Sequence, residues 1–557
     1  MGSMGTPHCS KYDVLIIGAG FSGICSLHHI RERFPSWRVK VLEAGSDVGG
    51  TWYWNRYPGA RFDSESVSYS FSWDQDLLDE WHWKEAFSAQ PETLRYIQHV
   101  TKKHDLYKDI QFNTRIVSAT WQDDDDDDYA KNNEHTWTFT DETGAQYRTT
   151  FFISCLGFLS SPTLPNIPGI ESFAGQAFHT SRWPENFDLS DLADKRVGII
   201  GTGATGVQTI TELAKVPLKS LSVFQRTANW TAPLRNTKIT ADEMSKLKQG
   251  YDSVFQTCSK SPLGLLHQPD PRKSADVTDA ERTELWNKLY AKPGFGKWLG
   301  VFRDTYTDRE ANRLYSDFMA QKMRDRISDP TTAEDLIPKN HGFGLRRVPL
   351  DSGYLEAFNQ PNVHLVNLQR TPIESISASG ITTADGKSHD LDVLIFATGF
   401  DAVTGAFREI RWSVKDRRPL LGYSGASKLG KPDARAVWVD HRPKTFLGLT
   451  VPSCPNMMMV LGPHQPFGNA TRSIEHAVGI ICELLQHCAD NKYTYVEPTE
   501  AAVQEWTEHV VECSRGLLSN EIDSWMTGVN KNVAGVQAEW LERLDFSDLY
   551  HRYHCYD

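Results

Sequence analysis

The sequence of 557 residues has no apolar run that approaches the ~20 residues of a bilayer-spanning helix. It also has no basic tail or cluster, since Lys and Arg total 59 against 71 Asp and Glu and the formal net charge is −12. We therefore expect neither nucleic acid nor an anionic membrane surface as a partner. Residues 1–12 lack the apolar stretch of a secretory signal. The expectation is a cytoplasmic protein that is monomeric.

The nine cysteines are scattered, and no two of them form a CxxC pair. Their odd number and wide spacing fit free thiols in a reducing compartment. This spacing excludes a cysteine zinc site and a dithiol redox centre, and we expect no metal site. By contrast, the 17 tryptophans are many for such a chain and favour aromatic-lined pockets.

Two β–α–β units open on glycine-rich turns. In the first, an apolar run at 12–17 is followed by helical character over 21–33 and by a short strand at 39–43. In the second, apolar runs at 196–200 and 221–224 flank another such turn. Continuous apolar runs are typical of parallel strands that are buried on both faces. Two separate units predict an α/β fold with two Rossmann-like dinucleotide-binding domains.

The first turn, GAGFSG, contains Gly18, Gly20 and Gly23. In this motif the three glycines permit a tight turn, close backbone approach to a pyrophosphate, and close packing of helix on sheet. Glu43 follows Gly23 by 20 residues, where an acid accepts a hydrogen bond from a ribose hydroxyl. The strand, turn, helix and spaced acid together predict a dinucleotide site.

The second turn, GTGATG, contains Gly201, Thr202, Gly203 and Gly206. Here the residue 20 positions further on is Arg226, and Thr227 follows it. An arginine at this place suits the 2′-phosphate of NADP, and a surface arginine at a strand end is the alternative. One acid and one base at equivalent places indicate two different dinucleotides, FAD at the first turn and NADPH at the second.

Composition divides the remainder of the chain. Residues 236–330 are rich in Lys, Glu, Asp and Ala, and their periodicity predicts a helical insertion. The six consecutive Asp at 123–128 indicate a solvated hairpin tip, with a metal or partner site as the alternative, because like charges repel one another. A buried strand is expected at 392–396, and amphipathic helices at 473–488 and 501–513. The predicted domains are an FAD-binding domain at 1–155 and 386–557, an NADP-binding domain at 156–235 and 331–385, and the insertion between them.

Two longer motifs carry a resemblance to a known family. The segment FAGQAFHTSRWP matches the pattern FxGxxxHxxxWP at Phe173, Gly175, His179, Trp183 and Pro184. The segment GGTWYWNRYPGARFD at 49–63 also recurs in that family. Over nearly its whole length the chain resembles the type I Baeyer–Villiger monooxygenases, flavoenzymes that insert an oxygen atom beside a ketone carbonyl. The flavin monooxygenases that oxidise nitrogen or sulfur usually lack the Trp-Pro pair of this motif.

The resemblance implies FAD and NADPH as cofactors, and a small-molecule ketone and O2 as substrates. It assigns catalysis to Arg347 and Asp63, with an ordinary buried ion pair as the alternative. In this family the arginine would keep a flavin C4a-peroxide anionic until it attacks the carbonyl, and the aspartate would hold the guanidinium. Products are then esters or lactones.

The resemblance also assigns cofactor contacts and a closing loop. His179 is expected to orient the domains and not to carry a proton. Arg346 would help hold the 2′-phosphate, at a position where the family usually has lysine. Trp525 would lie on a mobile C-terminal loop that closes the site. The full set of implied cofactor contacts outside the two glycine turns is Glu43, Gly50, Thr51, Trp52, Asp63, Arg226, Thr227, Arg346 and Trp525.

The choice of ketone depends on the side chains that line the substrate pocket. Leu449, Phe467 and Trp525 are candidate pocket residues, and each could equally belong to the core. The loop at 461–475 lacks the short insertion of phenylacetone-type members and resembles cyclohexanone-monooxygenase-like members in length. This favours cyclic or aliphatic ketones. An N- or S-oxidising flavin monooxygenase and, more remotely, an inactive flavoprotein that serves as a binding module are the other functions considered.

Overall fold

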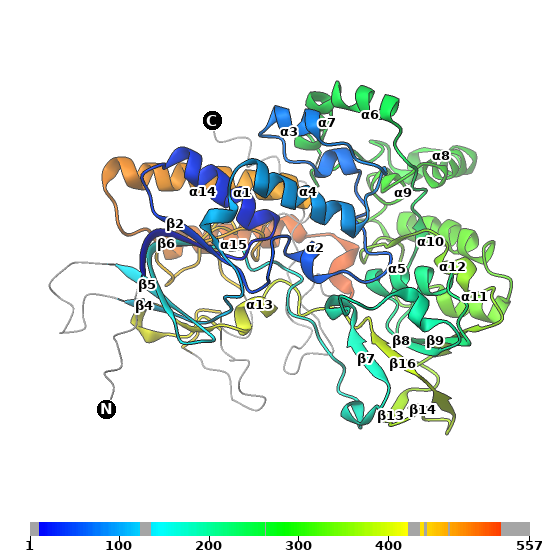
Figure 1. Ribbon diagram of the computed structural model, residues 1–557. Helices are drawn as coiled ribbons and strands as arrows, with labels where there is room; N and C mark the ends of the chain where they lie inside the picture. The colour runs from blue at the N-terminus through cyan, green and yellow to red at the C-terminus, as the bar shows by residue number, and fades with distance from the viewer. Residues whose placement is uncertain are drawn as a thin grey trace.

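The structure is a computed structural model that describes residues 10–122, 135–261, 263–421, 435–438, 443–465 and 468–524. The Asp run at 123–128, Phe467 and Trp525 lie outside these ranges. Two sheet-based units lie side by side, and a block of helices packs beside the second unit (Figure 1). Among the described helices, none combines the length and the apolar character needed to cross a membrane.

The larger sheet has eight strands in the order β17-β4-β5-β6-β1-β2-β3, with β18 also paired to β6. Strand β1 pairs in parallel with β2 and β6, whereas β5 pairs antiparallel with both β4 and β6. The predicted hairpin is confirmed, because Trp121 of β4 lies opposite Trp137 of β5. The strands of this sheet are β1 (Ser10–Ile17), β2 (Val39–Leu42), β3 (Ile110–Gln111), β4 (Ile116–Gln122), β5 (Thr136–Asp141), β6 (Gln146–Ser154), β17 (Arg411–Ser413) and β18 (Met457–Met459).

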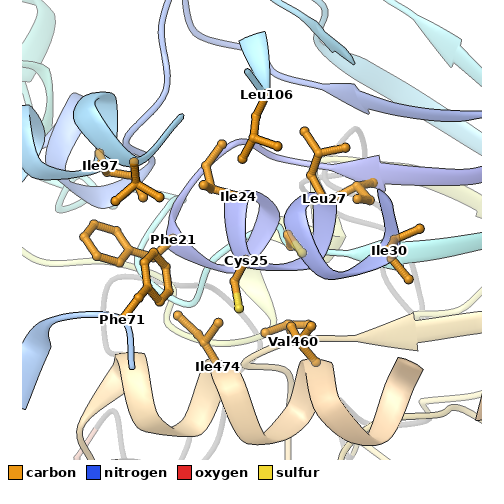
Figure 2. Packing of buried hydrophobic residues seen from close by; sticks show 14 of the residues in the cluster. Phe21, Ile24, Cys25, Leu27, Ile30, Phe71, Ile97, Leu106, Val460 and Ile474 are labelled. Atoms are coloured by element: carbon orange, nitrogen blue, oxygen red, sulfur yellow. The ribbon is translucent and has the colours of Figure 1, made fainter. Parts of the chain in front are cut away.

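Helix α1 (Phe21–Arg33) is buried between this sheet and other helices. Its apolar side chains meet Ile97 of α4 (Gln90–Lys103) and Ile474 of α14 (Ala470–Asn491) (Figure 2). Ile24 and Leu27 of α1 are fully buried, and removal of such side chains from water is what fixes the helix on the sheet. The predicted amphipathic helices are confirmed as α14 and α15 (Glu500–Ser514).

The second sheet has five parallel strands in the order β12-β9-β8-β16-β7. They are β7 (Gln176–His179), β8 (Arg196–Ile200), β9 (Ser220–Gln225), β12 (Val363–Asn367) and β16 (Val393–Phe396). Strand β16 corrects the predicted boundary at residue 386, since it pairs with β8 and β7 and belongs to this sheet. A buried apolar run has the same pattern in either sheet, so only its pairing partners assign it.

Residues 236–330 form helices, and the described part of this block contains no named strand. Local sequence explains where the helices begin: the Thr278 hydroxyl accepts a hydrogen bond from the Glu281 N–H, and Glu281 Oε2 accepts one from the Thr278 N–H at 2.8 Å. The helices here are α6 (Ala241–Lys248), α7 (Tyr251–Ser259), α8 (Asp279–Ala291), α9 (Gly296–Leu299) and α10 (Arg309–Arg324).

Short elements complete the fold around the two sheets. Strands β13 (Ile373–Ser377), β14 (Gly380–Thr383) and β15 (Ser388–Asp390) form an antiparallel sheet, and β10 (Ala232–Pro233) pairs with β11 (Leu350–Asp351). The other helices are α2 (Thr51–Trp54), α3 (Gln75–Glu80), α5 (Ala204–Leu213), α11 (Pro330–Leu336), α12 (Tyr354–Ala357) and α13 (Gly405–Arg408). Helix α5 follows β8 as α1 follows β1, which repeats the β–α–β unit.

Candidate active site

A cavity of about 1680 Å³ extends between the two sheets, past the ends of β1 and β8. It brings together most of the residues that the sequence indicated, although they come from six separate segments of the chain. The predicted residues that line it are Gly18, Gly20, Glu43, Gly50, Thr51, Trp52, Asp63, Gly201, Thr202, Gly203, Arg226, Thr227, Arg346 and Arg347.

The first glycine turn is shaped by close backbone contacts. Gly18 has φ +105°, and a Cβ there would lie 2.5 Å from the carbonyl oxygen of Cys155. A Cβ at Gly23 would lie 1.9 Å from the carbonyl oxygen of Gly18, so this glycine packs helix α1 against the turn and does not line the cavity. Gly20 caps α1 without any side-chain hydrogen bond to the first-turn N–H groups. Those donors suit the pyrophosphate of a dinucleotide.

The second glycine turn repeats this construction. A Cβ at Gly206 would lie 2.3 Å from the carbonyl oxygen of Gly201, which again packs the helix on the turn. A Cβ at Gly203 would meet no atom within 4 Å, so the cavity is open at this place. Gly203 caps α5 without a side-chain hydrogen bond. Open space in front of free helix N-terminal donors is what a second pyrophosphate needs.

Glu43 lies at the end of β2 and is only 5% exposed. Its Oε2 accepts a hydrogen bond from the Ala19 N–H and its Oε1 one from the Gly45 N–H, both at 2.6 Å. Burial raises the pKa of Glu43, and these backbone donors oppose the rise. Each carboxylate oxygen can accept a second hydrogen bond, so the group remains suited to a ribose hydroxyl.

Asp63 and Arg347 meet although 284 residues separate them in the chain. Arg347 Nη2 donates to Asp63 Oδ2 at 2.9 Å, with Asp63 2% exposed and the Arg347 side chain 32% exposed. Burial raises the pKa of Asp63, and the charge of Arg347 opposes the rise. Arg347 Nη1 is covered and has no hydrogen-bond partner among the described residues. This arrangement suits a bound acceptor or anion beside the guanidinium.

Arg226 and Arg346 lie near each other on the cavity wall. Burial lowers the pKa of Arg346, the charge of Asp523 opposes this, and the charge of Arg226 lowers the pKa further. Arg346 Nη2 donates to the Asp523 carbonyl oxygen at 2.5 Å, while its buried Nε has no partner within the described ranges. Two arginines that repel each other are stabilised by an anion between them, so both fit the 2′-phosphate of NADP.

The FxGxxxHxxxWP motif, hereafter the fingerprint motif, connects the second sheet to the loop after β16. The Ser181 N–H donates to His179 Nδ1 at 3.1 Å, so the ring proton is on Nε2, which lies 3.1 Å from the Gly399 carbonyl oxygen. Burial lowers the pKa of His179 to about 4. Both ring nitrogens are engaged, so His179 connects the end of β7 to the loop after β16.

The other fingerprint residues pack or face solvent and do not line the cavity. Trp183 is buried among the aromatic rings of Phe178 and Phe187. A Cβ at Gly175 would lie 2.5 Å from the Asp392 carbonyl oxygen, Phe173 packs on a satellite core, and Pro184 is exposed. Trp183, Gly175 and Phe173 therefore pack around the second sheet.

Two hydrogen bonds that the sequence did not indicate link the loop at 57–61 to helix α5. We call this link the tether. Tyr57 Oη donates to Gln208 Oε1 at 2.8 Å, and Gln208 Nε2 donates to the Arg61 carbonyl oxygen at 3.1 Å. Tyr57 and Gln208 both line the cavity. Gln208 lies in α5 two residues after the second glycine turn, but glutamine in a helix carries no sequence signal of such a contact.

Of the three predicted pocket residues, one lies in the core and two fall outside the described residues. Leu449 is 5% exposed and belongs to the core cluster around α1, and it is absent from the cavity wall. Phe467 and Trp525 fall outside the described residues. The described apolar wall instead includes side chains from the helical block that the sequence did not single out, namely Phe295, Trp298, Leu299 and Phe302.

Known proteins share this arrangement over nearly the whole chain. A family model described as flavin-binding monooxygenase-like matches residues 11–237. The chain is 40% identical over 522 residues to 2-oxo-Δ3-4,5,5-trimethylcyclopentenylacetyl-CoA monooxygenase of Pseudomonas putida, which covers 92% of this chain and 90% of the relative. It is 34% identical over 524 residues to a Baeyer–Villiger monooxygenase of Pseudooceanicola batsensis, with 94% and 90% covered. The chain belongs to the Baeyer–Villiger monooxygenases.

Two solved structures and one further relative extend the comparison. OTEMO in complex with FAD and NADP superposes with a TM-score of 0.87 at 37% identity, covering 99% of this chain and 97% of that one. Cyclohexanone monooxygenase from Rhodococcus sp. Phi1, bound to NADP+, gives 0.89 at 34% identity, covering 98% and 97%. A phenazine N-monooxygenase of Lysobacter antibioticus is 35% identical over 522 residues, covering 94% and 91%. The expected family, α/β fold and monooxygenase class are confirmed, and FAD and NADP are the cofactors in the solved relatives.

Proposed function

We propose that this enzyme binds FAD at the first glycine turn and NADPH at the second, and converts ketones to esters or lactones with O2. The observation that carries the proposal is Arg347, held by the buried carboxylate of Asp63 at 2.9 Å and lining the cavity that both turns share. The overall reaction consumes a ketone, O2, NADPH and a proton, and it releases an ester, water and NADP+.

The chain's own contribution is to hold positive charge where negative charge develops. When bound, FAD that NADPH has reduced supplies the oxygen atom from O2. Oxygen addition to a carbonyl places negative charge on oxygen, and the guanidinium of Arg347 supplies a positive charge to oppose it. Asp63 fixes that guanidinium through a charge-assisted hydrogen bond, so no reorganisation is needed during the reaction.

The cavity wall supports an uncharged substrate. Phe295, Trp298 and Phe302 line it from the helical block, and they favour an apolar body over a charged one. Such a pocket fits cyclic or aliphatic ketones, whose only polar group is the carbonyl that faces the arginine. Water exclusion by the same aromatic wall would protect the activated oxygen from unproductive loss.

A second candidate function is oxygen transfer to a ring nitrogen. It is favoured by one observation, the 35% identity to a phenazine N-monooxygenase over 94% of this chain. Nitrogen is itself the nucleophile in that chemistry, so a cation beside the oxygen donor would not be required. The Asp63–Arg347 pair therefore favours the ketone reaction.

A product assay separates the two functions. The purified holoenzyme is incubated with NADPH and O2 and either a panel of cyclic and aliphatic ketones or phenazine, and products are identified by mass. We expect lactones or esters, with ketone-stimulated oxidation of NADPH. Formation of an N-oxide, with no ester from any ketone, would replace the proposal with the second candidate.

A further inference from the structure

The C-terminal half of helix α1 carries a cluster of metal-ligating groups, which consists of two half-buried histidines and one exposed glutamate. His28, His29 and Glu32 each offer a ligand atom, and these atoms lie within 4.8 Å of one another. His28 Nε2 and Glu32 Oε2 are 3.6 Å apart. Zn²⁺ bound at its usual Zn–N and Zn–O distances separates two tetrahedral ligands by about 3.4 Å, so this pair is already close to a metal-bound spacing.

We propose that His28, His29 and Glu32 form a binding site for a divalent transition-metal ion of the Zn²⁺ type. Two imidazoles and one carboxylate are a ligand set that such ions prefer and that Mg²⁺ or Ca²⁺ does not. The cysteine spacings predict no metal site, whereas this site takes its ligands from neighbouring turns of one helix.

The surroundings orient the ligands. His28 stacks on Trp73, with ring centroids 4.0 Å apart and an interplanar angle of 17°. The His28 and His29 rings meet edge to face, with ring centroids 5.0 Å apart and an interplanar angle of 74°. Glu32 is 71% exposed and can rotate to close the site.

Charged side chains around the cluster both oppose and favour a bound cation. On α1 itself, Arg31 opposes a cation, but its guanidinium is paired with Asp109 at 3.2 Å. From other elements, Asp74 and Glu475 favour positive charge at the two histidines. His104 lies beside the site, with its ring centroid 4.6 Å from that of His28 and its Nε2 3.0 Å from Asp74 Oδ2. The carboxylates offset the arginine.

The test is a calorimetric titration of the holoenzyme with ZnCl2, alongside MgCl2. We expect one Zn²⁺ to bind per chain with micromolar affinity, and no heat from Mg²⁺. Glu32→Gln should weaken Zn²⁺ binding by about tenfold or more, since loss of a direct ligand costs at least as much as loss of its supporting groups. Because Glu32 is exposed, this variant keeps the packing of α1 intact. His28→Ala should abolish binding.

The matched control is His99→Ala. His99 Nε2 lies 3.1 Å from Glu80 Oε2, so it has the same kind of histidine–glutamate contact without a second histidine beside it. We expect this variant to bind Zn²⁺ as the unaltered enzyme does. The proposal is overturned if the unaltered enzyme binds no Zn²⁺ at micromolar concentration. It is equally overturned if Glu32→Gln and His28→Ala both keep the original affinity and stoichiometry.

Discussion

The phenol of Tyr57 donates a hydrogen bond to Gln208 Oε1 at 2.8 Å, and this links the loop before Asp63 to the helix that begins at the second glycine turn. Gln208 returns a bond to the Arg61 carbonyl oxygen at 3.1 Å. The backbone carbonyl of Gln208 also packs on Gly59, where a Cβ would lie 2.7 Å from that oxygen. The position of the Asp63 loop therefore depends on helix α5.

Tyr57→Phe should impair coupling between the cofactor regions more than it impairs folding. Loss of the hydroxyl removes one hydrogen bond and leaves Gln208 Oε1 unpaired, at a cost of about 1–2 kcal/mol in unfolding free energy. We expect a larger fraction of NADPH oxidation to proceed without ester formation. The ratio of ester formed to NADPH consumed measures this. Tyr53→Phe is the control, because among the described residues its hydroxyl hydrogen-bonds the backbone N–H and the hydroxyl of exposed Ser46 and no group of α5. Equal ratios in the two variants would contradict the tether.

Arg347→Ala should abolish ester formation while NADPH still reduces the flavin. The variant loses the cation that we propose beside the reacting oxygen, and removal of one such stabilising group lowers kcat by about 10²–10³-fold, which brings ester formation close to background. Arg347→Lys keeps the charge but loses the planar guanidinium, which bonds Asp63 through Nη2 and leaves Nη1 open among the described residues, so its activity should be intermediate. Stopped-flow reduction and product yield separate the two steps. An alanine variant that makes ester at the ordinary rate would remove Arg347 from catalysis.

Sequence patterns revealed the parts of the site that depend on local geometry. The glycine turns and Glu43 could be predicted because strand, turn and helix are adjacent in the chain. The Asp63–Arg347 contact spans 284 residues, and only resemblance to a family suggested it. Gln208 had no signal, because its role arises from packing between domains. Strand β16 was assigned to the wrong sheet for a similar reason, since pairing with β8 is a long-range choice.

Arg226→Ala and Arg346→Ala should each weaken the binding of NADPH much more than the binding of NADH. The two differ by the 2′-phosphate, and each arginine would supply one or two charge-assisted hydrogen bonds worth about 1.5–3 kcal/mol each. The KM for each nicotinamide cofactor gives the comparison. Arg313→Ala, an exposed arginine paired with Glu310, is the control and should change neither value. Equal losses for both cofactors would refute the 2′-phosphate assignment.

His179 should make the folded enzyme less stable as the pH falls from about 6.5 toward 4. Its pKa is lowered from 6.5 to about 4 by burial, so between these values the unfolded chain binds a proton that the folded chain excludes. From pH 7 to pH 5 this linkage costs about 2 kcal/mol. Urea unfolding of the enzyme and of His179→Gln at both pH values isolates the effect, because other buried histidines contribute equally to both proteins. The same pH dependence in the variant would show that His179 is not the group responsible.

Gly203→Ala and Gly206→Ala should separate cofactor binding from folding at the second turn. A Cβ at Gly203 meets no protein atom within 4 Å, and its φ of −74° is open to any residue, so the fold should be unaffected. That methyl group would instead occupy the space in front of α5 where a pyrophosphate is expected, and the KM for NADPH should rise. At Gly206 the Cβ would lie 2.3 Å from the Gly201 carbonyl oxygen, so overpacking should lower the unfolding free energy by about 1–3 kcal/mol. Thermal unfolding without NADPH and the KM for NADPH are measured for both variants. If Gly203→Ala bound NADPH normally, the phosphates would have to lie elsewhere along the cavity.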